Sequence, residues 1–95
     1  MFKELDPLLH SELRLGVMSI LISVESADFT YIRKQTGSTA GNLSVQLEKL
    51  SQAGYITIEK GYSGKVPRTT CRISQIGMDA FKEYVEALQS YIARK

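Results

Sequence analysis

The chain has 95 residues, of which 43% are apolar and 23% are charged, and its formal net charge is +2. A chain of this length forms one small domain, residues 1–95, which excludes a multi-domain protein. The single cysteine, Cys71, excludes an internal disulfide framework and a zinc site built from several thiolates.

No segment is long and apolar enough to span a bilayer, which takes roughly 20 residues. The longest uncharged apolar stretch runs from Leu15 to Val24, and we expect it to lie buried in a helix. The residues before it are net acidic, whereas a secretion signal begins with positive charge. We therefore expect a cytoplasmic protein with no membrane partner.

The first quarter of the chain predicts one helix and a short connector. Asp6, which precedes a proline, and Ser11 are alternative N-caps for this helix. Apolar residues then recur at helical spacing, and the helix ends near Ser23. Residues 26–29 connect it to the next element, with room for a stub of strand.

Two helices in close succession are expected next. Thr30 is the predicted N-cap of a short helix over residues 31–36, which Gly37 closes. Either Ser38 or Thr39 then caps the second helix of the pair.

This second helix has one apolar face. Leu43, Leu47 and Leu50 are spaced four and three residues apart, which predicts a single stripe packed on the core. The helix continues to Gln52 and stops at Gly54.

A hairpin and a long helix complete the chain. Residues 55–59 and 69–73 alternate at period two, and residues 61–67 between them contain two glycines and a proline, which predicts a β-hairpin with an extended tip. Ser74 is the expected N-cap of a last helix that runs to about Ala93.

This order of elements is typical of a winged helix-turn-helix domain, a mainly α fold with a small β-hairpin, here with an added C-terminal dimerisation helix. The helix-turn-helix covers about residues 30–53, with its second helix as the recognition helix. The wing covers about residues 55–73 and the C-terminal helix about residues 75–93.

The sequence itself resembles small MarR/ArsR-like winged helix transcriptional regulators over nearly its whole length. The segments that carry the resemblance are Leu5-Asp6-Pro7-Leu8-Leu9-His10-Ser11, Arg14-Leu15, Ala27-Asp28-Phe29-Thr30, Thr36-Gly37, Gly41-Asn42-Leu43-Ser44, Leu47-Glu48-Lys49-Leu50, Ala53-Gly54-Tyr55-Ile56 and Pro67-Arg68-Thr69-Thr70. The most specific are the recognition-helix string 41–54 and the wing return 67–70. The resemblance implies a dimeric DNA-binding repressor or activator.

The side of the recognition helix opposite its leucines carries small and polar residues, which suits insertion into a major groove. Asn42 and Gln46 are candidates for paired hydrogen bonds to adenine, and Val45 for contact with a thymine methyl group. With Lys49, these residues form the predicted base-reading set.

The start of the same helix is a candidate phosphate site. Ser38, Thr39 and Ser44 have hydroxyl groups near the free N–H groups of the helix N-terminus. The alternative for Ser38 and Thr39 is helix capping, and the two roles are compatible.

The middle of the chain is its basic part, and the predicted wing holds four of its cations, Lys60, Lys65, Arg68 and Arg72, with only Glu59 beside them. Residues 28–72 have a net charge of +4, and the alternation in the second strand places Arg68 and Thr70 on the outer side. We expect Lys65, Arg68 and Thr70 to contact the DNA backbone or minor groove, with Arg33 adding a backbone contact from the short helix.

Catalysis and metal binding have little support. His10 is the single histidine, so one chain cannot form a two-histidine metal site. Cys71 alternates with the outward cations, so we expect it to point inward and pack as a small apolar group. We predict no enzymatic activity and no cofactor.

The last helix has apolar side chains over a wider arc than docking on one core requires, which predicts a second buried contact. A second copy of the chain is the simplest source, and a thicker core within one chain is the alternative. The predicted dimer interface consists of Phe81, Tyr84, Val85, Leu88, Tyr91 and Ile92.

We therefore predict a homodimeric regulator that binds double-stranded DNA with inverted half-sites in a sequence-specific manner. The rival interpretation is a winged helix that binds a partner protein and never contacts DNA. The sequence identifies no small-molecule effector.

Overall fold

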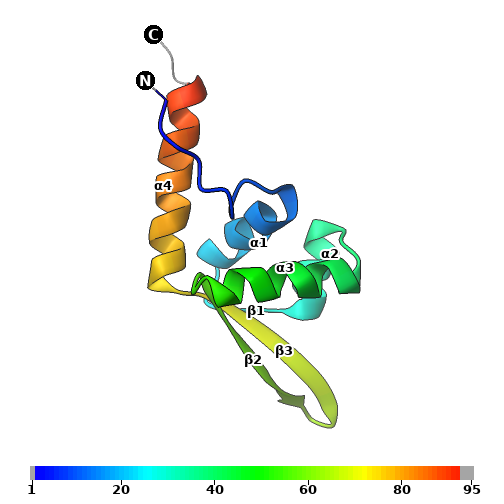
Figure 1. Ribbon diagram of the computed structural model, residues 1–95. Coiled ribbons are helices and arrows are strands. Elements are labelled where there is room, and N and C mark those ends of the chain that lie inside the picture. The colour runs from blue at the N-terminus through cyan, green and yellow to red at the C-terminus, as the bar shows by residue number, and fades with distance from the viewer. Residues whose placement is uncertain (1, 93–95) are drawn as a thin grey trace.

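The computed structural model describes residues 2–92, which form four helices and a small antiparallel sheet (Figure 1). In chain order the elements are α1 (Glu12–Ile22), β1 (Ala27–Asp28), α2 (Phe29–Thr36), α3 (Ala40–Gln52), β2 (Ile56–Ser63), β3 (Val66–Ile73) and α4 (Gln75–Ile92). This arrangement confirms the mainly α, winged helix fold that the order of sequence signals predicts. The predicted end of the last helix at Ala93 lies outside the described residues.

Local capping decides where the first two helices begin. Ser11, the second of the two predicted caps, starts α1 by accepting a hydrogen bond from the Arg14 N–H. Asp6 instead accepts the Leu8 N–H in a turn before the helix. The prediction of Thr30 as the cap of α2 is wrong, because the Asp28 carboxylate accepts the Tyr31 N–H and the helix starts two residues earlier.

The next helices begin at predicted caps. The Thr39 hydroxyl accepts the Asn42 N–H at the start of α3, and the Ser74 hydroxyl accepts the Gly77 N–H at the start of α4. In both cases the side chain satisfies a backbone donor that the first helical turn leaves without a partner.

The wing spans about the predicted residues, but its strands are longer and more regular than the sequence predicts. β2 pairs with β3 from Ile56↔Ile73 to Ser63↔Val66, so most of the expected tip, residues 61–67, is paired strand. The loop has only two residues and begins with Gly64 at φ 66°, which is the glycine-first pattern of a type II′ hairpin turn. β1 adds a short third strand on the other side of β3.

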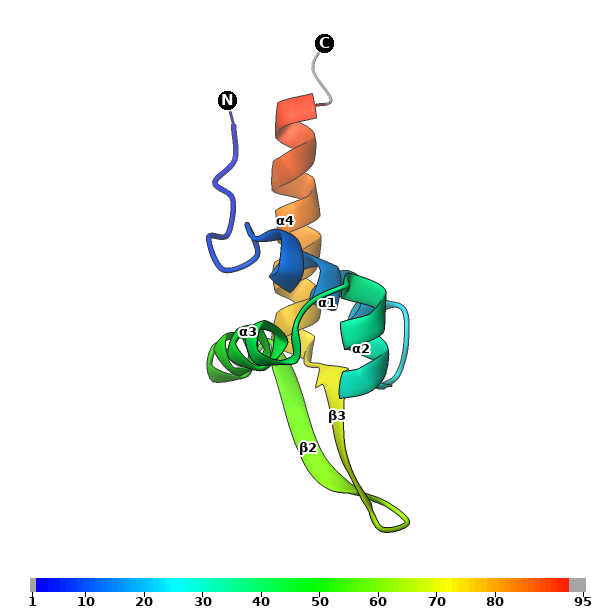
Figure 2. The same cartoon turned by 90° about the vertical axis from the view of Figure 1, so that its right-hand side faces the viewer.

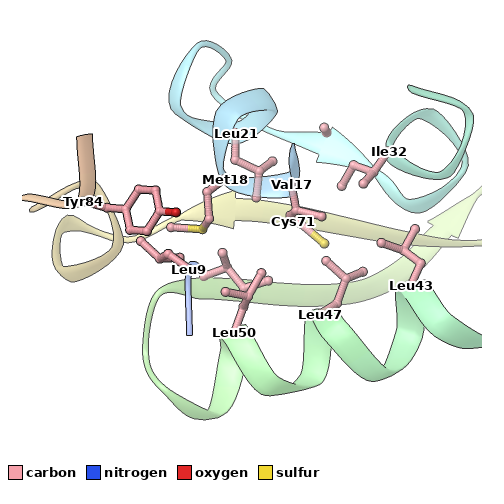
Figure 3. Close-up of a cluster of buried hydrophobic side chains, with 12 residues drawn as sticks. Leu9, Val17, Met18, Leu21, Ile32, Leu43, Leu47, Leu50, Cys71 and Tyr84 are labelled. Atoms are coloured by element: carbon pink, nitrogen blue, oxygen red, sulfur yellow. The ribbon is translucent and has the colours of Figure 1, made fainter. Parts of the chain in front are cut away.

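The core lies between α3, α1 and β3. Leu43, Leu47 and Leu50 point from α3 toward α1 and the sheet, and all three are buried (Figure 3). Cys71 is buried beside them, which confirms the inward orientation expected from the strand alternation. The apolar stripe of α3 thereby leaves the opposite side of that helix free.

The described chain is elongated, with principal extents of 56 × 25 × 21 Å. The wing and α4 project in opposite directions from the central helices, as both views show (Figures 1 and 2). Beside the far end of α4 lies the N-terminal segment, where the Phe2 ring stacks on the Tyr91 ring with centroids 4.5 Å apart. No helix within residues 2–92 is long and apolar enough to cross a membrane.

Candidate nucleic-acid interface

The outward side of α3 carries most of the side chains predicted to read bases. Asn42, Ser44, Val45 and Lys49 are exposed, while the leucines on the other side are buried. Val45 is 52% exposed, so its apolar side chain is available for contact. The helix therefore presents short and polar groups to solvent over its first three turns.

Gln46 lies at the edge of this face and is half-buried. Its side-chain oxygen accepts a hydrogen bond from the Arg14 guanidinium, and its side-chain nitrogen donates to Asn42 Oδ1 at 3.1 Å. Arg14 also donates from Nε to the Leu8 carbonyl at 2.5 Å. Gln46, which is predicted to contact a base, is thus hydrogen-bonded to α1, and Asn42 is hydrogen-bonded to Gln46.

Sequence reasoning missed Arg14. It is 32 positions from Gln46 along the chain, and no local pattern signals that α1 and α3 bring the two side chains together. Its only sequence signal is a cation within the apolar first helix, which is too general to assign a role.

The hydroxyl groups at the start of α3 serve local structure. Thr39 caps the helix, and the Ser38 hydroxyl lies 2.8 Å from the Thr36 hydroxyl. Beside them, Arg33 and Lys34 line a shallow depression of about 440 Å³ together with Ser38. Cations and hydroxyl groups therefore lie next to each other at this end of the helix-turn-helix.

The arginines of the wing contact acidic groups on neighbouring elements. Arg68 Nη2 lies 3.1 Å from Asp28 Oδ2, and Arg72 pairs with Glu25 at 3.6 Å and Glu59 at 3.4 Å. These are surface pairs, each worth about 0–1 kcal/mol. A phosphate can replace such a partner at little energetic cost.

The rest of the wing has mixed exposure. Lys65, in the hairpin loop, is exposed and forms no ion pair with any described residue. Thr70 is half-buried in β3, opposite Asp28 of β1 and Glu59 of β2. Its position in the middle strand makes it the least accessible of the predicted wing contacts.

A groove separates α3 from the wing. Its volume is about 330 Å³, and both Ser44 of α3 and Lys60 of β2 line it. Glu48 of α3 and Thr69 of β3 also line this groove. We call the exposed side of α3 (Asn42, Ser44, Val45 and Lys49), together with the hairpin cations Lys60, Lys65 and Arg68, the α3–wing surface.

The single histidine and the single cysteine have structural contacts, His10 at the surface and Cys71 in the core. The His10 Nδ1 atom lies 3.0 Å from the Tyr84 hydroxyl, and burial raises the pKa of Cys71 to about 11. A thiol with this pKa is almost fully protonated at neutral pH, which makes it a poor nucleophile. Residues 2–92 contain no group of three or more metal-ligating side chains.

The residues predicted for a dimer interface differ in their exposure. Tyr84 is 4% exposed and packs within the core of its own chain, so it is not available to a second copy. Phe81 is half-buried against the same core. Val85, Leu88, Tyr91 and Ile92 remain exposed along the projecting part of α4.

Comparison with known proteins supports the same class of molecule. The family described as winged helix DNA-binding domain matches residues 13–92. The uncharacterized protein MJ0432 of Methanocaldococcus jannaschii is 31% identical over 81 residues, which cover 84% of this chain and 88% of that protein.

Solved structures with this fold include proteins described as transcriptional regulators or their homologues. A transcriptional regulator homologue from Pyrococcus horikoshii superposes with a TM-score of 0.84 at 30% identity, covering 90% of this chain and 85% of that one. A MarR family regulator from Silicibacter pomeroyi has the same fold at a TM-score of 0.69 and 15% identity, over 88% of this chain and 56% of that one. The resemblance to winged helix regulators is confirmed at the level of family and fold.

Proposed function

Since the chain belongs to the family of winged helix DNA-binding domains, we propose that it is a homodimeric transcriptional regulator that recognises specific double-stranded DNA sequences. In this proposal α3 enters the major groove, and the wing contacts the backbone or the adjacent minor groove. The family and fold are those of transcriptional regulators, and we propose no catalytic activity for the chain.

The α3–wing surface is the observation that carries the proposal. Its helix side presents Asn42, Val45 and Lys49 to solvent, in the mixture of polar and small apolar groups that reads base edges. Its hairpin side contributes cations, which supply affinity for phosphates but no sequence information. A polar helix face beside a cationic hairpin supports a polyanionic duplex as the partner.

Backbone contacts are proposed for Ser38, Thr39, Ser44, Arg33, Lys65, Arg68 and Thr70. Lys65 is at the exposed end of the hairpin and can reach DNA without breaking an ion pair to a described residue. Arg68 must exchange Asp28 for a phosphate, and the exposed position of that pair makes the exchange inexpensive. Thr39 keeps its capping bond while the neighbouring N–H groups of the helix face the phosphate.

The exposed apolar residues of α4 support the proposed homodimer. Two copies related by a twofold axis would present their α3 helices to successive major-groove faces about 34 Å apart, so the DNA would carry inverted half-sites. The exposed part of α4 lies away from the wing, so an interface there leaves the α3–wing surface open (Figure 1).

A protein-binding winged helix is the competing function. It uses the same fold but requires neither cations in the wing nor a polar outward face on α3. Binding to duplex DNA with a strong salt dependence separates the two, because counterion release is specific to a polyanion partner.

The wing assignment is tested with Lys65→Ala/Arg68→Ala. If both side chains bind phosphates, binding to every duplex weakens, and the slope of log affinity against log salt falls by about 0.9 for each phosphate that the variant no longer neutralises. The measurement is a titration of fluorescent duplex at several salt concentrations.

The matched control is Lys3→Ala/Lys82→Ala, which removes two cations from the end of the molecule that bears α4. We expect its salt slope to equal that of the wild type. An unchanged slope in the wing variant would refute the wing contacts, and absence of duplex binding by the wild type would favour the protein-binding function.

A further inference from the structure

A relay of three side chains connects α1 to the outward side of α3. The Arg14 guanidinium donates from Nε to the Leu8 carbonyl and from Nη1 to Gln46 Oε1. Gln46 Nε2 then donates to Asn42 Oδ1 at 3.1 Å. The relay begins in a half-buried part of α1 and ends at an exposed side chain of the proposed reading face.

The chemistry of arginine gives this relay one direction. A guanidinium has only donors, so the group of Gln46 that faces Arg14 must be its oxygen. The Gln46 nitrogen therefore faces Asn42 and requires an acceptor there, which is the Asn42 oxygen. The Asn42 –NH₂ group is left to face solvent.

From this direction we infer that Arg14 is a positioning residue that makes Asn42 a hydrogen-bond donor toward the bases, so that the contacted position is read as guanine. The inference rests on the proposed function. In the major groove guanine presents two acceptors, N7 and O6, and thymine presents one, O4, beside a methyl group. Cytosine presents a donor, and adenine presents an acceptor beside a donor.

This inference differs from the sequence-based expectation for Asn42 and Gln46. An amide side chain pairs with adenine by offering its oxygen to N6 and its nitrogen to N7 at the same time. Here both oxygens are turned toward donors inside the protein, Gln46 Oε1 toward Arg14 and Asn42 Oδ1 toward Gln46, and each keeps one further lone pair. The Asn42 nitrogen is the group turned away from the relay, and we expect it to favour guanine, with two acceptors, over adenine, whose N6 is a donor.

The central experiment is Gln46→Glu. A glutamate still accepts from Arg14, but it cannot donate, so Asn42 must turn its nitrogen toward the carboxylate and its oxygen toward the DNA. Bound fragments are first selected from a random duplex pool with the wild type and with Asn42→Ala. The position whose preference disappears in Asn42→Ala is the one that Asn42 contacts.

At that position we expect the wild type to bind guanine about tenfold more tightly than adenine, the lower part of the range for one base contact. Gln46→Glu should lose this preference and favour cytosine or adenine, whose exposed amino groups need an acceptor. Gln52→Glu is the control, because it adds the same charge to α3 and leaves Arg14, Gln46 and Asn42 unchanged. It should weaken binding to all duplexes without changing the base preference.

Arg14→Met separates positioning from a purely structural role. It removes the donors but keeps an unbranched apolar stem, so Gln46 becomes free to turn. We expect the preference between guanine and adenine to shrink toward equality. A variant that is less stable but keeps the wild-type preference would show that Arg14 only supports the fold, and would overturn the inference.

A measurement without DNA tests the relay itself. In the free wild-type protein, the side-chain amide protons of Gln46 should exchange with solvent more slowly than those of the exposed Gln89, and Arg14→Met should remove the difference. Equal rates in the wild type would overturn the relay. If duplex binding persists while Gln46→Glu leaves the preference unchanged, the inference fails and the proposed function stands; if the wild type binds no duplex, both fail.

Discussion

Tyr55 is the residue through which the N-terminal segment is held to the end of α3. Its hydroxyl donates to Asp6 Oδ2 at 2.6 Å, while Asp6 Oδ1 accepts the Leu8 N–H. The hydrogen bond to this carboxylate, followed by burial, raises the pKa of Tyr55 to about 12. This hydrogen bond holds the N-terminal segment against the end of α3. The same segment carries the Leu8 carbonyl, which accepts a hydrogen bond from Arg14 Nε.

The effect of Tyr55 on stability depends on pH. A phenol whose pKa is higher in the folded state than its ordinary value near 10 stabilises the fold fully below that value. The contribution then falls as the pH rises from about 10 to about 12. We expect Tyr55→Phe to lower the free energy of unfolding by about 1 kcal/mol at neutral pH, as for one partly exposed hydrogen bond.

The difference between wild type and Tyr55→Phe, measured by urea unfolding from pH 7 to pH 11.5, should be constant up to about pH 10 and then shrink. Tyr62→Phe, at the exposed end of the wing, is the matched control and should show no such difference. A difference that grows above pH 10 would contradict the assigned hydrogen bond.

At the scale of the elements, sequence reasoning succeeds where the signal is local. The leucine stripe of α3 and the caps Thr39 and Ser74 are each contained within one or two helical turns, and the structure confirms them. Thr30 and Asp28 are both good capping residues two positions apart, and pairing of β1 with β3 favours the earlier one.

The site is less predictable than the fold because it depends on contacts between distant segments. Exposure of Asn42 and Lys49 follows from helical periodicity alone. The hydrogen bond of Gln46 to Arg14 and the burial of Tyr84 arise only when α1, α3 and α4 pack together. Similarly, the ion pair between Arg68 and Asp28 joins residues 40 positions apart.

Gly77 shows how closely α4 approaches the end of α3. A Cβ atom at this position would lie 2.0 Å from the Tyr55 carbonyl oxygen, and that oxygen also accepts the Ser74 N–H. Backbone atoms cannot move aside as a flexible side chain can. We expect Gly77→Ala to lower the free energy of unfolding by about 3 kcal/mol, the upper part of the range for overpacking.

Gly41 in α3 is the matched control, since a Cβ there meets no atom within 4 Å. Gly41→Ala should raise stability by about 0.5 kcal/mol through helix propensity. Thermal unfolding of the two variants measures the contrast. If the two variants changed the free energy of unfolding equally, the close packing of Gly77 on the Tyr55 carbonyl would be wrong.

At the scale of the whole molecule, the elongated shape places two surfaces at opposite ends. The wing extends from one end, and the projecting part of α4 extends from the other (Figure 2). Along α4, Phe81, Val85, Leu88 and Ile92 follow each other at steps of four, three and four residues, which places them on one stripe. This stripe continues outward from the core, and Ile92 is 73% exposed at its end.

Such a stripe predicts that substitutions in α4 can abolish dimerisation without altering the DNA-binding surface of each copy. Val85→Glu/Leu88→Glu would bury two carboxylates against apolar side chains in the proposed dimer, which an interface does not tolerate without partners. We expect this variant to sediment as a monomer while it keeps its folded circular dichroism spectrum.

The expected change in DNA affinity follows from effective concentration. A dimer that engages two half-sites gains about 10²–10⁴ over a single module. The α4 variant should therefore lose at least about 10²-fold in affinity for a duplex with inverted half-sites and retain wild-type affinity for a single half-site. Val24→Glu, at an exposed apolar residue in the connection after α1, should change neither property. If the α4 variant still sediments as a dimer, the copies associate through another surface, and the proposed α4 interface is wrong.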